Sequence, residues 1–254
     1  MSRRLAPLAL AACLLAGTAL FSPPASAQDT ARAGRTQAAG DTVGAAPFFG
    51  RTWAVVAYDS TSGQLGLAAA STEFSVGSGG VHLEPGTGAV VVQGGADGAA
   101  GRRILAALRG GRSPASAVRP PAGEPAPVQA AALTPACERA WQRAPGAEQD
   151  ARSLPGRTGG VCYLAVGVRL RGAASMDRLV RAFRSSTGPL VERLQGTLSA
   201  MESAAPNAAG TRSAVLWVAA DETGDRVLGR REVRLGVDDH ERPALALEKR
   251  LEVG

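Results

Sequence analysis

Two strand-like runs that follow one another almost without a break place the strongest constraint on how this chain folds. Thr52–Tyr58 is rich in β-branched, aromatic and small apolar residues, and Gln64–Ser71 has the pattern of a second strand. Between them, Asp59–Gly63 has the composition of a turn, which predicts a β-hairpin. A further run, Gly88–Gln93, is continuously apolar up to its last residue, which predicts a strand covered on both faces. The chain is therefore expected to build a sheet with layers on both sides.

Helical patterns follow the first strands, and strands then return. Ser175–Phe183 has apolar residues at helical spacing and a serine that can cap the first turn. Pro189–Ala204 is a second predicted helix, with its proline in the first turn. Residues 112–136 are rich in proline and alanine and give no assignment. This order predicts a layered α+β or sandwich domain rather than a strict βαβ alternation. The other predicted elements are helices over 101–108 and 242–251 and strands over Val161–Leu170, Ser213–Ala220 and Arg231–Leu235.

The first residues have the pattern of an export signal. A basic segment, Met1–Arg4, precedes the uncharged run Leu5–Phe21 and the triplet Ala25-Ser26-Ala27, which predicts cleavage after Ala27. We therefore divide the chain into a signal peptide (1–27), a flexible linker (28–51) and one domain (52–254), and expect a secreted or periplasmic protein. We expect no membrane span once the signal is removed. Two alternatives stay open. The apolar run is a membrane anchor, or Cys13 is lipidated.

Export changes how the remaining cysteines, Cys137 and Cys162, are interpreted. Two cysteines in an oxidising compartment more often pair than stay free, so we predict a disulfide. The alternative is a catalytic cysteine, but neither has a histidine near it in the sequence.

The charge and the aromatic content of the chain argue against nucleic-acid binding. The net charge of +6 is carried almost wholly by arginine, since Lys249 is the only lysine, and the arginines are interspersed with acidic residues. Aromatic residues make up 4% of the chain, too few for a surface that stacks on bases, so we expect no nucleic-acid partner.

Motif searches remove further chemistries. The chain has no phosphate-binding loop and no nucleophile elbow, and His82 stands where a dinucleotide fingerprint needs its third glycine. Only His82 and His240 are present, and no cysteine or histidine cluster has metal-binding spacing, so we expect neither cofactor nor metal. A cation bound at Asp238–His240 and a Ser-His-Asp triad on either histidine are the less favoured alternatives.

Thr52 offers a chemistry that needs no histidine. In an N-terminal-nucleophile hydrolase, a threonine hydroxyl attacks an acyl carbon and the α-amine of the same residue acts as the base. A strand that begins with threonine and leads at once into a hairpin suits that role. The amine is free only if the Arg51–Thr52 bond is cut.

Several segments resemble a known family. Thr52–Asp59 (TWAVVAYD), followed by Thr61–Ala68 (TSGQLGLA), is similar to the opening of the bacterial and archaeal family called domain of unknown function 1028. The similarity continues in Gly86–Gln93, in the helix Arg103–Gly111, in Phe183–Leu198, in Arg212–Ala214 and in Val237–His240. The resemblance implies a four-layer αββα sandwich of the N-terminal-nucleophile type, with Thr52 at the position of the presumed nucleophile.

Two motifs of that family are missing here. A strand of pattern R-Q-x-G-V-V is replaced by the proline- and alanine-rich stretch, and Ala165–Val168 stands where members have a Gly-Asn pair after the second cysteine. An asparagine near the site is a natural donor to an oxyanion, so its absence bears directly on turnover.

Three hypotheses about the function follow. In the first, the chain is an exported amidohydrolase acting on a small-molecule or peptide-like amide, with Thr52 as nucleophile and base and with Asp59, Ser71 and Arg212 as supporting candidates. In the second, it is a non-catalytic exported domain that binds a cell-envelope or small-molecule ligand. In the third, it is a basic exported protein held at anionic surfaces. A homo-oligomer is compatible with each.

Overall fold

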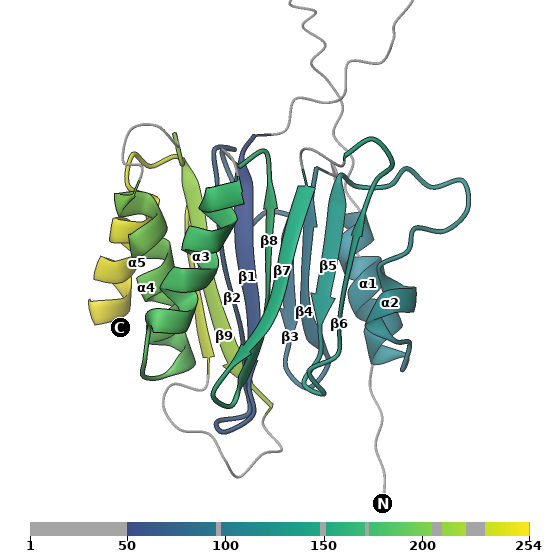
Figure 1. The fold of residues 1–254 in the computed structure, drawn as a ribbon, viewed down its shortest axis with the longest axis horizontal. Coiled ribbons are helices and arrows are strands. Elements are labelled where there is room, and N and C mark those ends of the chain that lie inside the picture. Colours follow the sequence, from purple (N-terminus) through teal and green to yellow (C-terminus); the bar gives the residue numbers. More distant parts are fainter. Residues whose placement is uncertain are drawn as a thin grey trace, which may run out of the picture. The chain divides into compact units, whose positions relative to one another are not determined.

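Two antiparallel sheets packed face to face form the centre of the fold, which we describe from a computed structural model (Figure 1). The structure describes residues 50–94, 98–147, 151–170, 173–204, 210–221 and 232–253. The predicted signal peptide, Cys13 and nearly all of the predicted linker lie outside these residues. No helix in the described part of the chain is long and apolar enough to cross a bilayer.

The larger sheet, sheet A, has six strands in the order β10-β9-β2-β1-β8-β7. Its central hairpin pairs β1 with β2 over their full lengths, from Thr52 opposite Ser71 to Asp59 opposite Gln64. The hairpin prediction is therefore confirmed. The strands are β10 (Glu232–Val237), β9 (Ser213–Ala220), β2 (Gln64–Ser71), β1 (Thr52–Asp59), β8 (Val161–Val168) and β7 (Ala151–Thr158).

The smaller sheet, sheet B, has four strands in the order β3-β4-β5-β6. They are β3 (Val81–Glu84), β4 (Gly88–Gln93), β5 (Gln129–Leu133) and β6 (Arg139–Arg143). The stretch 112–136, which gave no assignment from the sequence, contains β5, and β5 pairs with both β4 and β6. Three consecutive alanines give β5 little intrinsic strand signal, although all of its residues are buried.

Helices cover the outer face of each sheet, which gives four layers in the order helix, sheet, sheet, helix (Figure 1). Apolar residues of α3, α4 and α5 pack on sheet A, and those of α1 and α2 pack on sheet B. The α+β prediction is confirmed. α3 begins before Ser175, so that serine lies inside the helix and does not cap it. The helices are α1 (Ala99–Arg109), α2 (Pro114–Ala117), α3 (Ala173–Ser185), α4 (Leu190–Ser203) and α5 (Pro243–Val253).

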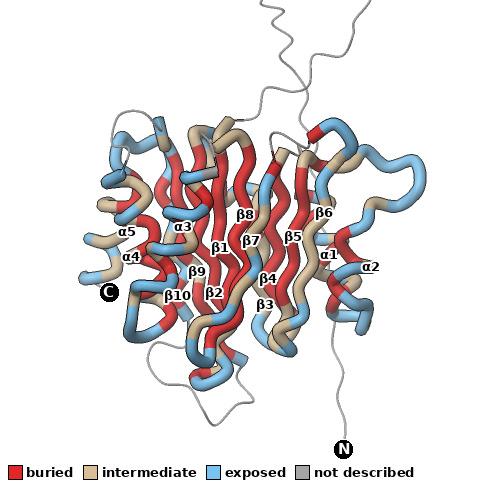
Figure 2. Tube along the Cα trace, viewed as in Figure 1, coloured by how far each residue is buried: buried red, intermediate tan, exposed pale blue. Residues whose placement is uncertain are grey.

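Alternation along β1 shows how the sequence produces these layers. Trp53, Val55 and Ala57 face the helices, while Ala54 and Val56 face sheet B. Both sets are buried, as Figure 2 shows for the central strands. Because β1 has apolar residues on both faces, it reads as a continuous apolar run rather than an alternating one.

A disulfide joins the two sheets. Cys137, between β5 and β6, is bonded to Cys162 in β8, with their Cα atoms 5.9 Å apart. The predicted pairing is confirmed. Cys162 is fully buried among the residues between the sheets, so the cross-link runs through the core.

Candidate functional site

Thr52 is the first residue of β1, and its side chain points into the space between the two sheets. The direction follows from the strand alternation, because Thr52 shares a face with Ala54 and Val56. Its side chain is 9% exposed, and its hydroxyl oxygen lies 2.7 Å from that of Ser71. The structure thus brings two of the predicted site residues into direct contact.

The hydroxyl contact belongs to a polar row at one end of sheet A. Ser71 pairs with Thr52 on one side and with Ser213 of β9 on the other. The Ser213 hydroxyl accepts the N–H of Val76 at 2.9 Å and donates to the carbonyl of Glu73 at 2.9 Å. It therefore holds the loop that leaves β2. Thr52, Ser71 and Ser213 together form what we call the hydroxyl row.

The main chain before Thr52 is held by the loop after β2. The Arg51 N–H donates to the Thr72 hydroxyl at 2.9 Å, and the Arg51 carbonyl accepts the Thr72 N–H at 2.9 Å. The same carbonyl accepts the Ser71 hydroxyl at 3.3 Å. The last residue of the predicted linker is thus fixed to the β2 exit rather than flexible. In the uncut chain, the Thr52 nitrogen is part of a peptide bond and has no basic lone pair.

Arg212 lies at the same end of sheet A, but its side chain points elsewhere. Its N–H donates to the Ser71 carbonyl at 2.8 Å, which fixes the end of β2. Its guanidinium pairs with Asp239, with Nε 2.9 Å from the carboxylate, and lies 6.0 Å from the centre of the Phe74 ring. Arg212 therefore supports the hydroxyl row through its backbone.

Asp59 is the predicted site residue that the fold keeps away from the others. It ends β1, seven residues beyond Thr52, and so lies at the opposite end of the strand. Its carboxylate accepts the N–H of Thr61 at 2.9 Å and the hydroxyl of Ser62 at 3.0 Å. Those bonds explain Asp59 as a turn residue.

Two glutamines and a tryptophan of sheet B form a polar cluster that the sequence analysis missed. Gln93 ends β4, Gln129 begins β5, and the two are paired neighbours whose amides are hydrogen-bonded. The Trp141 indole N–H donates to Gln129 Oε1 at 2.7 Å. Gln93 is 5% and Gln129 1% exposed. The sequence feature that could have indicated this cluster is Gln93 itself, the single polar residue at the end of the apolar run Gly88–Gln93.

An apolar residue lies on the other side of Thr52. Val168 of β8 is the residue paired with Thr52, and it packs against Ala147 and Ala151. Thr52 therefore has a hydroxyl neighbour on β2 and an aliphatic neighbour on β8. The resemblance places the missing Gly-Asn pair in this part of β8.

The two histidines are used elsewhere. His82 of β3 lies against Gly101 of α1, and burial is the main cause that lowers its pKa below 6.5. The His240 ring accepts the Arg242 N–H at 2.9 Å. Across the described ranges, no three His, Cys, Asp or Glu side chains converge as metal ligands would. Among the described residues, the hydroxyl of Thr52 is in contact with another hydroxyl, that of Ser71, and each of the two histidines has a different neighbour.

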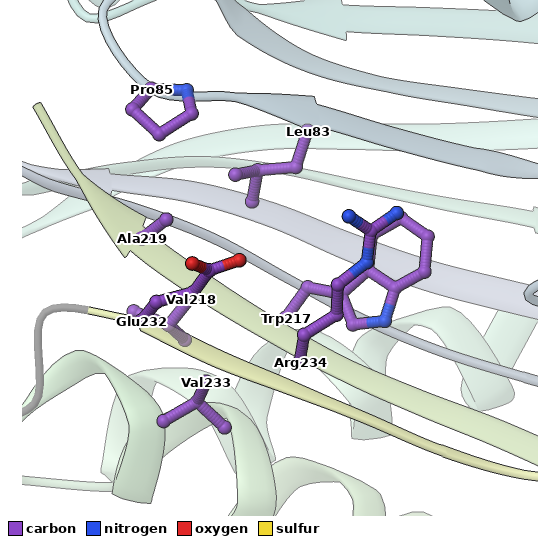
Figure 3. Close-up of a pocket in the computed structure, with 8 residues that line it drawn as sticks. All are labelled: Leu83, Pro85, Trp217, Val218, Ala219, Glu232, Val233 and Arg234. Carbon is purple, nitrogen blue, oxygen red and sulfur yellow. The ribbon is translucent and has the colours of Figure 1, made fainter.

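Two hollows lie on the surface outside the hydroxyl row. An open one, near Arg212, Asp239 and His240, adjoins the Thr52 end of sheet A. A smaller one lies between β3, β9 and β10, where Arg234 stacks on Trp217 at 4.3 Å from the ring centre (Figure 3). The smaller hollow adjoins Ala219, which pairs with Leu65 near the Asp59 end of the sheet. It is therefore remote from Thr52.

Comparison with known proteins supports the family suggested by the motifs. The model of a family described as "Family of unknown function (DUF1028)" matches residues 52–247. The crystal structure of protein SPO2555 from Silicibacter pomeroyi, also described as DUF1028, is similar to this chain. The two share 25% identity and a TM-score of 0.67, over 80% of this chain and 85% of that one. No curated protein matches the chain.

Proposed function

The chain belongs to the DUF1028 family, and we propose that it is an exported amide hydrolase of the N-terminal-nucleophile type, with Thr52 as its nucleophile. The observation that carries the proposal is the placement of Thr52. It is the first residue of a central strand, its hydroxyl points between the sheets, and Ser71 holds that hydroxyl at 2.7 Å. The four-layer arrangement supports the same proposal, because the resemblance implies that layering for this type of hydrolase.

Cleavage of the Arg51–Thr52 bond is the required first event. It frees the α-amine of Thr52, which then takes the proton of the Thr52 hydroxyl as that oxygen attacks the substrate carbonyl carbon. The new C–O bond pushes the carbonyl electron pair onto oxygen. Collapse of this intermediate breaks the C–N bond, and the leaving amine takes up the proton. Water then hydrolyses the acyl ester and restores the Thr52 hydroxyl.

Ser71 is a positioning residue in this scheme. Its hydroxyl contacts the Thr52 hydroxyl, and it also accepts the Glu73 N–H at 3.0 Å. That second bond and the Arg212 N–H on its carbonyl keep Ser71 in place. The substrate class is an amide or peptide-like compound whose acyl group fits between the sheets.

Export is part of the proposal. The signal-like residues 1–27 predict it, and the disulfide between Cys137 and Cys162 supports it because such bonds persist mainly in oxidising compartments. We place the protein outside the cytoplasm, secreted or periplasmic.

A second function is favoured by the contacts around Arg51. The two hydrogen bonds between Arg51 and Thr72 hold the uncut chain as an extension of β1. The side chain of Val168, which is paired with Thr52, is aliphatic and so offers no polar group to a reacting carbonyl. These observations favour a non-catalytic exported domain that keeps the fold and binds a cell-envelope or small-molecule ligand.

The first residue of the protein exported by its own host separates the two functions. We expect intact-mass spectrometry to give a chain that starts at Thr52. A chain that starts at Gln28 would contradict the hydrolase, because its Thr52 amine is acylated.

Activity is then tested on a chain produced to start at Thr52, which contains every helix and strand described above. It is compared with the same chain carrying Thr52→Ala and with a chain starting at Gln28, using a panel of acyl nitroanilides. We expect hydrolysis only by the first, with all three melting within a few degrees of one another. Equal rates for the first two would refute the proposal.

A further inference from the structure

The carboxamide of Gln93 is a buried hydrogen-bond donor without an acceptor. The residue is 5% exposed, and its Nε2 atom has no partner among the described residues. Leaving such a donor unsatisfied inside a protein costs free energy, so each case calls for an explanation. A ligand that brings an acceptor oxygen would satisfy it.

A chain of hydrogen bonds fixes which end of the Gln93 amide is free. The Trp141 indole nitrogen can only donate, so the Gln129 atom that faces it must be the oxygen. The Gln129 amide nitrogen is then left to face Gln93, which must present its own oxygen. Only the Gln93 NH₂ remains unused. The amide orientations thus follow from the chemistry of the indole.

The strand alternation directs the Gln93 side chain toward sheet A. Ala89 and Val91 of β4 pack between the sheets, while Val90 and Val92 pack against the α1 and α2 helices. Gln93 continues the first series and so faces sheet A. β4 packs against β1 and β2, the strands that carry Thr52 and Ser71.

Two contacts place Gln93 at the same end of the sandwich as the hydroxyl row. On one side, Gly80 accepts the Val92 N–H at 2.8 Å and lies against the Val76 carbonyl, and Val76 is bonded to Ser213. On the other side, Trp141 packs with Val168, the residue paired with Thr52. Gln93 therefore faces the hydroxyl row across the space between the sheets.

We propose that Gln93 Nε2 donates a hydrogen bond to the acyl oxygen of the substrate and to the oxyanion formed from it. This inference rests on the proposed function. When the Thr52 oxygen bonds to the acyl carbon, the carbonyl electron pair moves onto oxygen, and a preorganised N–H aimed at that oxygen stabilises the negative charge. The proton of the Thr52 hydroxyl goes to its own amine, so Gln93 exchanges no proton.

This assignment accounts for a site without the family's Gly-Asn pair. Val168 is paired with Thr52, and its aliphatic side chain supplies no donor. Gln93 supplies one from the opposite sheet, and the paired Gln129 and Trp141 hold it in a single orientation. The proposed oxyanion donor therefore comes from sheet B, whereas the resemblance places the family's Gly-Asn pair in β8 of sheet A.

The test measures acylation of the chain that starts at Thr52 by 4-nitrophenyl acetate. Nitrophenolate release gives the rate, and peptide mass mapping locates the acetyl group. The Thr52→Ala chain, which keeps a free N-terminal amine, gives the background. As an ionised carboxylate, the residue introduced by Gln93→Glu retains an acceptor for Gln129 and removes the donor. Gln142→Glu is the matched control, because Gln142 pairs with Ala130 on the face of sheet B that packs against α1.

We expect Gln93→Glu to lower the acylation rate roughly 100- to 1000-fold, toward the Thr52→Ala background, and Gln142→Glu to keep the parent rate. If Gln93→Glu does not fold by circular dichroism, Gln93→Met removes the donor without a charge and should show the same loss. A parent chain that reacts faster than Thr52→Ala while the folded Gln93 variants match the parent would overturn the role of Gln93 alone. A parent chain no faster than Thr52→Ala would overturn the proposed function and the role of Gln93 with it.

Discussion

Reducing the disulfide between Cys137 and Cys162 should destabilise the domain by a predictable amount. The bond closes a loop of 25 residues, which carries β6, β7 and the turns around them. Loop-closure entropy assigns such a cross-link about 3 kcal/mol of the free energy of unfolding. For a domain of this size, about 3 kcal/mol corresponds to a fall in Tm of roughly 6–12 °C.

The assay compares thermal unfolding of the oxidised chain with that of the same chain in a phosphine reductant. The reduced chain keeps both sulfur atoms, so the difference isolates the cross-link from any cavity left by a smaller side chain. The double variant Cys137→Ala, Cys162→Ala is the control, and its Tm should not respond to the reductant. Coincident melting curves for oxidised and reduced chains, with two free thiols titrated in the latter, would refute the reasoning.

Three further predictions concern packing and titration. Gly101→Ala should lower the free energy of unfolding by about 1–3 kcal/mol, because the added Cβ overlaps the His82 ring. In a chain that already carries His82→Ala, the same substitution should cost nothing. An equal cost in both chains would contradict the contact. Burial lowers the pKa of His82 below 6.5, so the unfolded chain binds the proton more readily and stability falls as the pH drops below about 6.5. Denaturant unfolding at pH 7.5 and 5 should show a smaller loss for His82→Gln, and equal losses would refute the assignment. Gly66→Ala should lower the free energy of unfolding, measured with a denaturant, by about 1–3 kcal/mol, because the new Cβ would lie 2.7 Å from Leu194. Gly236→Ala is the control and should be nearly neutral, because its Cβ would have ordinary contacts. Equal effects of the two substitutions would contradict this packing.

The elements predicted from sequence are those whose burial is complete or strongly periodic. β2 and β9 have the predicted bounds because each is a nearly continuous apolar run that ends at a serine or other polar position. β7 was missed because it is an edge strand whose buried and exposed positions alternate, and it contains Pro155 and Gly156. The bounds of α3 and α5 differ from the predictions by one or two residues at each end, as is usual where helices begin and end.

The residues of the candidate site also differ in how far the sequence alone could predict their positions. Thr52 and Ser71 belong to one predicted hairpin, and the register of that hairpin brings their hydroxyls into contact. Gln93 was missed because its partners come from two other strands, and only the pairing of β4, β5 and β6 brings them together. Asp59 is only seven residues from Thr52 in the sequence, but an extended strand separates residues that a helix would keep close.

The hydroxyl row also has a consequence for how this chain would change if it lost an enzymatic role. Ser71 and Ser213 satisfy backbone groups of the loop after β2, so the fold needs them whether or not a substrate is ever turned over. A lineage that lost its enzymatic role would therefore continue to retain both serines under selection for stability alone. Drift after such a loss would be visible first at residues without structural bonds of this kind. The amide nitrogen of Gln93 has no such bond in the described protein, although the Gln93 oxygen accepts the N–H of Gln129.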